Sequence, residues 1–301
     1  MIAITGANGF IGKNLFLSFL KEEKEMILVD YSFDSIENNE KHLLLNPEDF
    51  LINIETDTIS PSFVFHQGAC TDTMCYDEAY MIRENYIYTV RLIDLCVKKN
   101  IPIVYASSAA VYGDGPFQEE AVKNPKNIYA KSKSLVDDYI EDLISTTETQ
   151  ITGLRYFNVY GPREERKGKM SSVINQFKEQ ILSNKEIKIF EKSEEYKRDF
   201  IYVDDVVSVN RHFYNENISG IFNCGTGQAQ SFSEVPKILK NHFEFDIKEI
   251  KMPSHLQGKY QEYTESDNRK LVEVGKYNKK FLSLQEGIGK NVEYWYTNGL
   301  C

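Results

Sequence analysis

Three observations predict an α/β fold built on a doubly wound parallel sheet. Short apolar segments alternate with amphipathic helical patterns from residue 2 to residue 155, as in parallel sheets that are covered on both faces. The first apolar segment leads directly into three regularly spaced glycines and a helix, the arrangement of a Rossmann-type nucleotide-binding unit. Beyond residue 158 the alternation gives way to shorter elements, which predicts a smaller, interleaved α/β unit.

Hydrophobic periodicity places the individual strands and helices. Strands are predicted at residues 2–5, 26–30, 62–66, 101–106, 151–155, 187–190, 200–203 and 220–224, and helices at about 76–99, 128–146 and 171–183. Residues 31–61 are polar and acidic and predict no clear element. Asp204 and Asp205 are predicted to cap a further helix.

The composition indicates an ordinary globular protein and narrows the classes of function. Of 301 residues, 42% are hydrophobic and 27% are charged, and no apolar run approaches the roughly 20 residues of a membrane span. The first residues enter a strand directly, which predicts that there is no signal peptide. The five cysteines are scattered, without metal-ligand spacing, so we expect reduced thiols, a cytoplasmic protein and no metal site. The formal net charge of −10 argues against a nucleic-acid partner.

Gly6, Gly9 and Gly12 directly follow the first strand and open an amphipathic helix. Glycines in this context permit a tight turn and the close approach of a pyrophosphate to the helix N-terminus. The second strand ends in Asp30, about eighteen residues after the last glycine, where a carboxylate can hold the hydroxyl groups of an adenosine ribose. A helix or turn cap is the other interpretation of Asp30. The small residues 68–71, after a later strand, suit a backbone that lies beside a cofactor.

Tyr129 and Lys133 are four residues apart in a predicted helix, so their side chains lie one turn apart on the same face. If this helix faces an oxidised nicotinamide, the positive charges of Lys133 and of the ring would lower the pKa of the Tyr129 phenol. The phenolate could then accept a proton from a sugar hydroxyl while hydride leaves the carbon that carries it. The alternative is a packed tyrosine and a solvated lysine. Asn85 is also open to two interpretations, a contact with backbone or cofactor and a buried packing amide. His66, at a strand end, is interpreted as structural.

Five segments together resemble the extended short-chain dehydrogenase/reductases that act on nucleotide sugars, over essentially the whole chain. They are Thr5-Gly6-Ala-Asn-Gly9-Phe-Ile-Gly12, Ser107-Ser108-Ala-Ala-Val-Tyr112-Gly113, Tyr129-x-x-x-Lys133, Arg155-Tyr-Phe-Asn158-Val-Tyr-Gly-Pro162 and Arg198-Asp-Phe-Ile-Tyr-Val-Asp-Asp205. The resemblance implies one tightly bound nicotinamide cofactor per chain, NAD or NADP. We expect residues 1–156 plus about 201–228 to form the NAD(P)-binding domain, and about 157–200 plus 229–301 to form the substrate-binding domain.

Within that superfamily, four stretches are similar to the ADP-glyceromanno-heptose 6-epimerases. They are His66-Gln-Gly-Ala-Cys70, Tyr160-Gly-Pro-Arg-Glu-Glu-Arg-Lys167-Gly-Lys-Met170, Phe190-Glu-Lys-Ser-Glu-Glu-Tyr-Lys-Arg198-Asp-Phe200 and Gly258-Lys-Tyr260-Gln. This similarity implies a nucleotide-diphosphate heptose as substrate. It also implies inversion at C6 of ADP-D-glycero-D-manno-heptose, through a 6-keto intermediate, to give the L-glycero sugar of the lipopolysaccharide inner core. The implied assembly is a homo-oligomer, specifically a pentamer.

The resemblance also implies a role for individual residues. Tyr129 and Lys167 would transfer protons on the two faces of the sugar. Ser108 would hydrogen-bond the reacting oxygen, and Lys133 would hold the nicotinamide ribose. From the residues alone, a solvated lysine in a charged loop is the favoured interpretation of Lys167, and Ser108 can also be a strand-end hydroxyl that caps backbone. The implied cofactor-binding residues are Gly6, Gly9, Phe10, Ile11, Gly12, Asp30, Tyr31, Gln67, Gly68, Ala69, Cys70, Thr71, Asn85, Tyr129, Lys133, Val159 and Lys167. The implied substrate-binding residues are Asn158, Lys169, Gln176, Phe190, Glu191, Lys192, Ser193, Arg198 and Tyr260, with Gln176 standing where a histidine is expected.

The acidic segment after the second strand favours NAD over NADP. Asp30, Asp34 and Glu37 lie near the expected adenosine ribose, and no basic residue precedes Lys41. These carboxylates would repel the 2′-phosphate of NADP unless Lys41 folds back towards it.

Other activities share the cofactor motifs. A UDP-hexose 4-epimerase would use a single tyrosine on both faces without needing Lys167, and a GDP-heptose epimerase would use similar machinery. A 4,6-dehydratase would resemble Thr-Asp-Glu-Val-Tyr-Gly at the stretch where this chain has Ser108-Ala-Ala-Val-Tyr-Gly. It is disfavoured because this chain lacks the Asp-Glu pair that would help to eliminate water. A non-catalytic NAD-binding sensor is disfavoured because Ser108, Tyr129 and Lys133 are all present.

Overall fold

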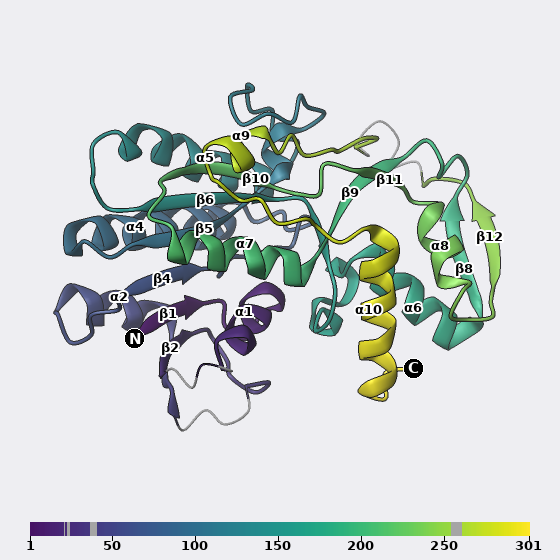
Figure 1. Cartoon of the computed structure of the whole chain (residues 1–301), viewed down its shortest axis with the longest axis horizontal. Coiled ribbons are helices and arrows are strands. Elements are labelled where there is room, and N and C mark those ends of the chain that lie inside the picture. Colours follow the sequence, from purple (N-terminus) through teal and green to yellow (C-terminus); the bar gives the residue numbers. More distant parts are fainter. Residues whose placement is uncertain (21, 23–24, 37–40, 254–260) are drawn as a thin grey trace.

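A seven-stranded parallel sheet forms the central layer of the protein (Figure 1). The computed structural model describes the chain except residues 21, 23–24, 37–40 and 254–260. The strands of this sheet are β1 (Ile2–Thr5), β2 (Met26–Val29), β3 (Leu43–Leu45), β4 (Phe63–His66), β5 (Ile103–Ser108), β6 (Ile151–Tyr156) and β10 (Gly220–Cys224). Their order is β10-β6-β5-β4-β1-β2-β3, with every neighbouring pair parallel. The order reverses between β1 and β4, and ligands of such sheets bind at the carboxyl ends of the strands at that point.

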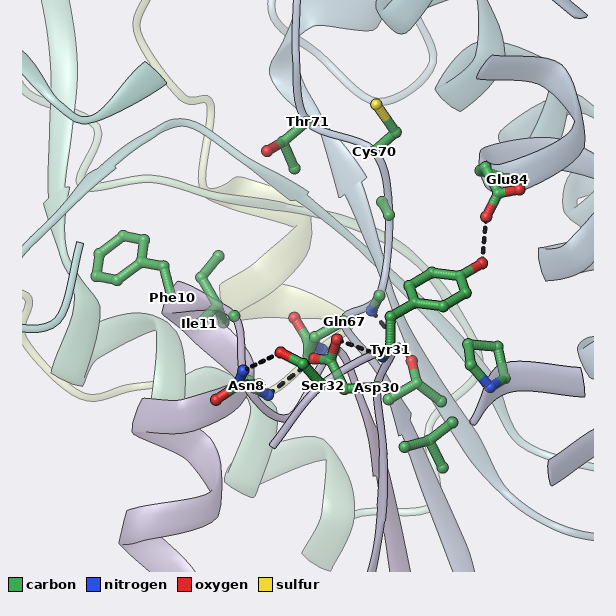
Figure 2. Close-up of a pocket in the computed structure, with 18 of the residues that line it drawn as sticks. Asn8, Phe10, Ile11, Asp30, Tyr31, Ser32, Gln67, Cys70, Thr71 and Glu84 are labelled. Carbon is green, nitrogen blue, oxygen red and sulfur yellow. Dashed lines mark hydrogen bonds between the residues drawn. The ribbon is translucent and has the colours of Figure 1, made fainter. Parts of the chain in front are cut away.

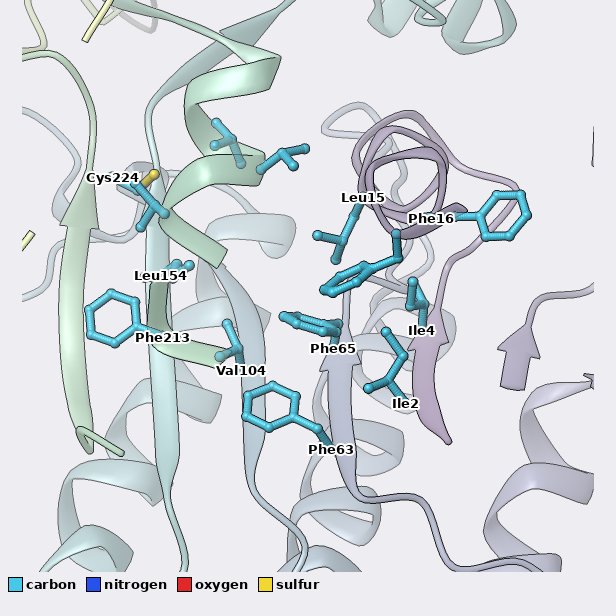
Figure 3. Close-up of a cluster of buried hydrophobic side chains, with 14 of the residues drawn as sticks. Ile2, Ile4, Leu15, Phe16, Phe63, Phe65, Val104, Leu154, Phe213 and Cys224 are labelled. Carbon is cyan, nitrogen blue, oxygen red and sulfur yellow. The ribbon is translucent and has the colours of Figure 1, made fainter. Parts of the chain in front are cut away.

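Helices cover both faces of the sheet, as the alternating sequence pattern predicts. Helices α1 (Phe10–Leu20) and α7 (Val203–Asn215) lie on one face, and α2 (Pro47–Glu55), α4 (Tyr88–Lys99) and α5 (Ile128–Ile144) lie on the other (Figure 1). Figure 3 shows the first of the two resulting cores, where Leu15 of α1 and Phe213 of α7 lie among strand side chains such as Phe65 and Val104. The predicted doubly wound α/β class is therefore confirmed.

A smaller α/β unit lies beside the large sheet (Figure 1). It contains a three-stranded sheet, β11-β9-β7, and a two-stranded sheet, β12-β8. Its strands are β7 (Asn158–Tyr160), β8 (Glu186–Phe190), β9 (Lys197–Tyr202), β11 (Ala229–Ser231) and β12 (Asp246–Ile250), and its helices are α6 (Val173–Asn184), α8 (Glu234–Leu239) and α10 (Leu284–Thr297). These helices share a third core that contains the fully buried Trp295. The unit takes segments from before and after β10, and β9 crosses the domain boundary that was expected near residue 200.

Three segments differ from the sequence prediction. Residues 31–61, which predict no clear element, contain β3 and α2. The helix predicted at 76–99 consists of α3 (Glu78–Met81), a π-helical turn, η2 (Ile82–Ile87), and α4. Asp204 and Asp205 do not cap α7, because Tyr202 is its N-cap and both acids lie in the first turn. The Asp205 carboxylate instead accepts a hydrogen bond from the Leu282 backbone at 2.9 Å and thereby holds the segment that leads into α10. Helix α9 (Arg269–Glu273) packs against β10.

The first turn after β1 leaves no space for a side chain at Gly12. A Cβ atom there would lie 2.0 Å from the carbonyl oxygen of Gly6, so the backbone would have to move, at a considerable cost in free energy. We expect Gly12→Ala to lower the free energy of unfolding by roughly 3 kcal/mol, the upper part of the usual range for overpacking. Urea unfolding, followed by circular dichroism, measures this change.

Gly289, within α10, provides the matched control. A Cβ atom at this glycine would meet nothing within 4 Å. Gly289→Ala should therefore stabilise the protein by about 0.5–1 kcal/mol, because alanine is the better helix former. Equal effects of the two substitutions would contradict the tight turn.

Candidate active site

A cavity of about 470 Å³ opens at the carboxyl ends of β1, β2 and β4, where the strand order reverses. The glycine turn, the segment after β2 and the segment after β4 form its walls, as Figure 2 shows. The predicted cofactor residues that line it are Gly6, Gly9, Phe10, Ile11, Gly12, Asp30, Tyr31, Gln67, Gly68, Ala69, Cys70, Thr71 and Lys167. The structure thus brings most of the predicted cofactor set into one cavity.

The backbone around Gly6 is packed closely enough to require glycine. Gly6 has a φ of +64°, and a Cβ atom there would lie 2.7 Å from the backbone nitrogen of Gly68. The Thr5 hydroxyl accepts a hydrogen bond from the same nitrogen at 3.0 Å, which holds the two turns together. The N-terminus of α1, beginning at Phe10, faces this cradle with backbone N–H groups that have no partner within the helix. These features fit a pyrophosphate of a dinucleotide.

Asp30 lies in the cavity wall at the end of β2. Its two carboxylate oxygens accept hydrogen bonds from the backbone of Asn8 at 2.9 Å and of Tyr31 at 2.8 Å. Burial raises the pKa of Asp30, and these hydrogen bonds oppose the rise. Each oxygen keeps lone-pair capacity for a further donor. Asp30 therefore acts as a turn cap and can also accept ribose hydroxyl groups.

Asn85 supports the cavity from behind. Its side chain is fully buried in the π-helical turn η2, accepts a hydrogen bond from the Cys70 backbone at 2.7 Å and donates to the Cys70 carbonyl at 2.9 Å. It also donates to the Ser132 hydroxyl of α5 at 3.1 Å. π-Helical turns occur often at functional sites. Asn85 therefore contacts backbone, as one interpretation expected, and is fully buried, as the other expected, and it does not line the cavity.

Tyr129, Lys133 and Ser108 form a group between α5 and the end of β5. A hydrogen bond from Ser108 lowers the pKa of Tyr129, but burial has the larger effect and raises it. Lys133 is buried, donates to the Ala106 carbonyl at 2.8 Å, and has its pKa lowered by burial to about 8. The net effect of these two contributions is a raised pKa of the Tyr129 phenol.

None of these three residues lines the dinucleotide cavity itself. Asn85 connects them to it, because it bonds the backbone of Cys70 in the cavity wall and the hydroxyl of Ser132, which precedes Lys133 in α5. The neighbouring His66, structural in the sequence analysis, is buried between the hydroxyls of Thr5 and Thr89. Burial lowers its pKa to about 3, so it is a neutral packing residue.

A buried ion pair fixes α5 on the sheet. Arg155 of β6 and Asp137 of α5 are 2.7 Å apart, and both side chains are fully buried. The Asp137 carboxylate also accepts hydrogen bonds from the hydroxyls of Tyr105 and Ser107 of β5. Because Asp137 lies one turn after Lys133, these contacts set which face of α5 is turned towards the end of β5.

A second cavity, of about 890 Å³, lies between the large sheet and the smaller unit. The predicted substrate residues that line it are Asn158, Lys169, Gln176, Phe190, Ser193 and Arg198, and it also includes Val159, which was predicted to bind the cofactor. Glu191 and Lys192, also predicted to bind substrate, are exposed in the turn after β8, where Lys192 has a φ of +63°, and they do not line this cavity. Tyr260 lies outside the described residues.

Lys167 lies in the walls of both cavities. It belongs to the 3-10 helix η4 (Glu165–Met170), with its ammonium group 5.2 Å from the centre of the Phe10 ring. Burial lowers its pKa, and the nearby Glu164 opposes this effect. Gly168 follows with a φ of +51°, a left-handed conformation that turns the chain so that Lys169 faces only the second cavity.

Several residues of the dinucleotide cavity were missing from the sequence prediction. Asn8, Ser32 and Arg166 line it, and Asn8 donates to Ser32 at 3.0 Å. Asn8 could have been found, because it lies inside the glycine motif. Arg166 carries no local signal, because only the fold brings its loop to the segment after β2.

The fold, with the glycine turn and Asp30 in a cavity at the reversal point of the sheet, defines the class of dinucleotide-binding α/β enzymes. The chain belongs to the NAD dependent epimerase/dehydratase family, which it matches over residues 2–225. This membership confirms the predicted nicotinamide cofactor.

Three similar proteins are informative. A relative from Brachyspira hyodysenteriae named ADP-L-glycero-D-manno-heptose-6-epimerase is 44% identical over 318 residues, which cover 99% of this chain and 99% of the relative. The crystal structure of ADP-L-glycero-D-manno-heptose-6-epimerase from Helicobacter pylori has a TM-score of 0.86 at 29% identity and covers 98% of this chain and 96% of its own. UDP-glucose 4-epimerase from Thermotoga maritima has a TM-score of 0.86 at 28% identity and covers 99% of both chains. The resemblance to heptose 6-epimerases predicted from the sequence is thus confirmed.

Proposed function

We propose that this protein inverts C6 of ADP-D-glycero-D-manno-heptose and gives the L-glycero epimer through a 6-keto sugar. The observation that carries the proposal is that Lys167 lies in the wall shared by the dinucleotide cavity and the second cavity. A residue in this place can reach a sugar carbon that lies between cofactor and nucleotide. The 44% identity to a heptose 6-epimerase supports the choice of substrate.

The proposed roles of Tyr129 and Ser108 rest on the resemblance to the heptose 6-epimerases, and the position of Lys167 in both cavity walls supports its role. The nicotinamide cofactor, when bound, supplies hydride acceptance and hydride return. Tyr129, hydrogen-bonded by Ser108, takes or gives the proton of the C6 hydroxyl on one face. Lys167 does so on the other face after the ketone has turned, which is possible for a lysine whose pKa burial lowers. One proton and one hydride leave and return, so no net oxidation remains.

The second cavity suits the sugar nucleotide. Arg198, 6% exposed, and Lys169 bring positive charge to walls that also contain Phe190 and Phe232. Arginine offers a bidentate fork to a diphosphate, and the aromatic rings provide a surface for a base.

Incubation with ADP-D-glycero-D-manno-heptose, with product stereochemistry read by NMR, tests the proposal. We expect inversion at C6 and no comparable conversion of UDP-glucose. Epimerisation of UDP-glucose at C4, with the heptose left unchanged, would favour a hexose 4-epimerase instead.

The purified protein is expected to carry bound nicotinamide cofactor and to show no net redox change on turnover. The reason is that every hydride removed from the sugar is returned to it. Absorbance at 340 nm, recorded throughout substrate conversion, measures free reduced cofactor. Its accumulation in proportion to product would indicate a dehydrogenase.

We further propose that the enzyme acts in the cytoplasm as a homo-oligomer, with the pentamer as the expected form. All five cysteines are unpaired, which supports a reducing compartment. No helix in the described part of the chain is long and apolar enough to cross a membrane. Light scattering coupled to gel filtration would measure the oligomeric state.

A further inference from the structure

Arg166 places a guanidinium group in the wall of the dinucleotide cavity, at the end where Asp30 lies. One of its nitrogens donates to Asp34 Oδ1 at 2.8 Å, and the other pairs with Oδ2, which gives a bidentate ion pair. Asp34 itself does not line the cavity. The carboxylate therefore holds the guanidinium from the side that faces away from the cavity.

The same carboxylate is tied to the glycine turn. Asp34 Oδ1 accepts hydrogen bonds from the Asn8 side chain at 2.8 Å and from the Ser32 hydroxyl at 3.2 Å. The Asn8 backbone in turn donates to Asp30 at 2.9 Å, and the charge of Arg166 lowers the pKa of Asp30. Arg166 and Asp30 are therefore close neighbours, and a group attached to the ribose held by Asp30 lies within reach of Arg166.

We propose that Arg166 is the cofactor-specificity residue of this enzyme, and that Asp34 disfavours NADP by occupying it. The inference rests on the cofactor site of the proposed function. A 2′-phosphate carries close to two negative charges and binds arginine through the same bidentate geometry that Asp34 uses. The phosphate and the Asp34 carboxylate cannot both bind the Arg166 guanidinium in a bidentate manner. NADP must therefore displace Asp34, which then loses its ion pair with Arg166.

The other charged side chains that line the cavity, Glu84, Arg163 and Lys167, have different contacts from those of the Arg166–Asp34 pair. Glu84 accepts a hydrogen bond from the Tyr31 hydroxyl at 2.5 Å. Arg163 donates to Asn14 at 2.9 Å, and Lys167 is directed to the Phe10 ring. The preference for NAD expected from the acidic segment thus has a different cause from simple repulsion, since one of the carboxylates acts by neutralising a base.

Calorimetry with NAD and NADP on cofactor-stripped protein tests the inference without relying on activity. Asp34→Asn keeps an oxygen acceptor for Asn8 but removes the negative charge and the second oxygen that pair with the Arg166 guanidinium. We expect the ratio of the two dissociation constants to shift towards NADP by about tenfold. Adding Arg166→Gln to this variant should abolish the shift. Asp267→Asn is the matched control, because it removes a carboxylate bound by Arg269 far from the cavity and should leave the ratio unchanged.

Two results would contradict this inference alone, provided that the wild-type protein binds NAD. One is an unchanged ratio of dissociation constants in Asp34→Asn, and the other is a shift that persists after Arg166→Gln is added. A wild-type protein that binds neither dinucleotide would contradict both this inference and the proposed cofactor site. The pair is exposed and contributes little to stability, so all variants should unfold at the wild-type temperature.

Discussion

Replacing Lys167 with either methionine or arginine is expected to lower kcat by roughly 10²–10⁴-fold, the usual loss for a general acid–base group. A base must release its proton, which a lysine can do when burial lowers its pKa and which an arginine cannot. A phosphate-binding lysine would behave differently, because arginine would preserve the charge and methionine would mainly raise KM. Steady-state kinetics on the purified variants separate the two roles.

Lys169→Met provides the comparison within the same loop. Lys169 is exposed and lines only the second cavity, where it was predicted to contact the substrate. Its loss should raise KM and leave kcat close to the wild-type value. An active Lys167→Arg enzyme would contradict the two-base mechanism and support an epimerase that uses Tyr129 on both faces.

Tyr129→Phe is expected to cause a comparable loss, of about 10²–10⁴-fold in kcat, because it removes only the hydroxyl that exchanges the proton. The phenyl ring keeps its packing on α5, so the free energy of unfolding should change little. Tyr139→Phe is the control on the same helix, since the Tyr139 hydroxyl donates to Asp94 at the surface. We expect it to retain wild-type kcat. Full activity of Tyr129→Phe would remove this residue from the mechanism.

The fold was largely predictable because its strands are locally distinctive. Buried parallel strands such as β1 and β2 appear as continuous apolar runs, and the glycine turn marks the first crossover. β3 was missed because its apolar run, Leu43–Leu45, is only three residues long and stands in the polar segment 31–61 at the edge of the sheet. The capping role of Asp204 and Asp205 was wrong because Tyr202 is the N-cap of α7, and Asp205 instead accepts a hydrogen bond from Leu282 of a distant segment.

In the candidate site, too, local features were predictable from the sequence and contacts between distant segments were not. The spacing of Tyr129 and Lys133 on a helix is a local property, and the structure places both on α5. The position of Lys167 in both cavity walls depends instead on where the fold places the loop after β7. The pairing of Arg166 with Asp34 joins residues 132 positions apart, and no periodicity reports it. The acidic residues after the second strand therefore predicted a preference for NAD, but they did not show that Arg166 lies in the same cavity wall.

The central claim is that C6 is inverted by removal and return of the same hydride. ADP-D-glycero-D-manno-heptose that carries deuterium at C6 tests it most directly, with the product examined by NMR and mass spectrometry. We expect an L-glycero product that retains the deuterium at C6, because the hydride never exchanges with water. An inverted product that has lost the label to solvent, or a labelled sugar with unchanged configuration, would contradict it.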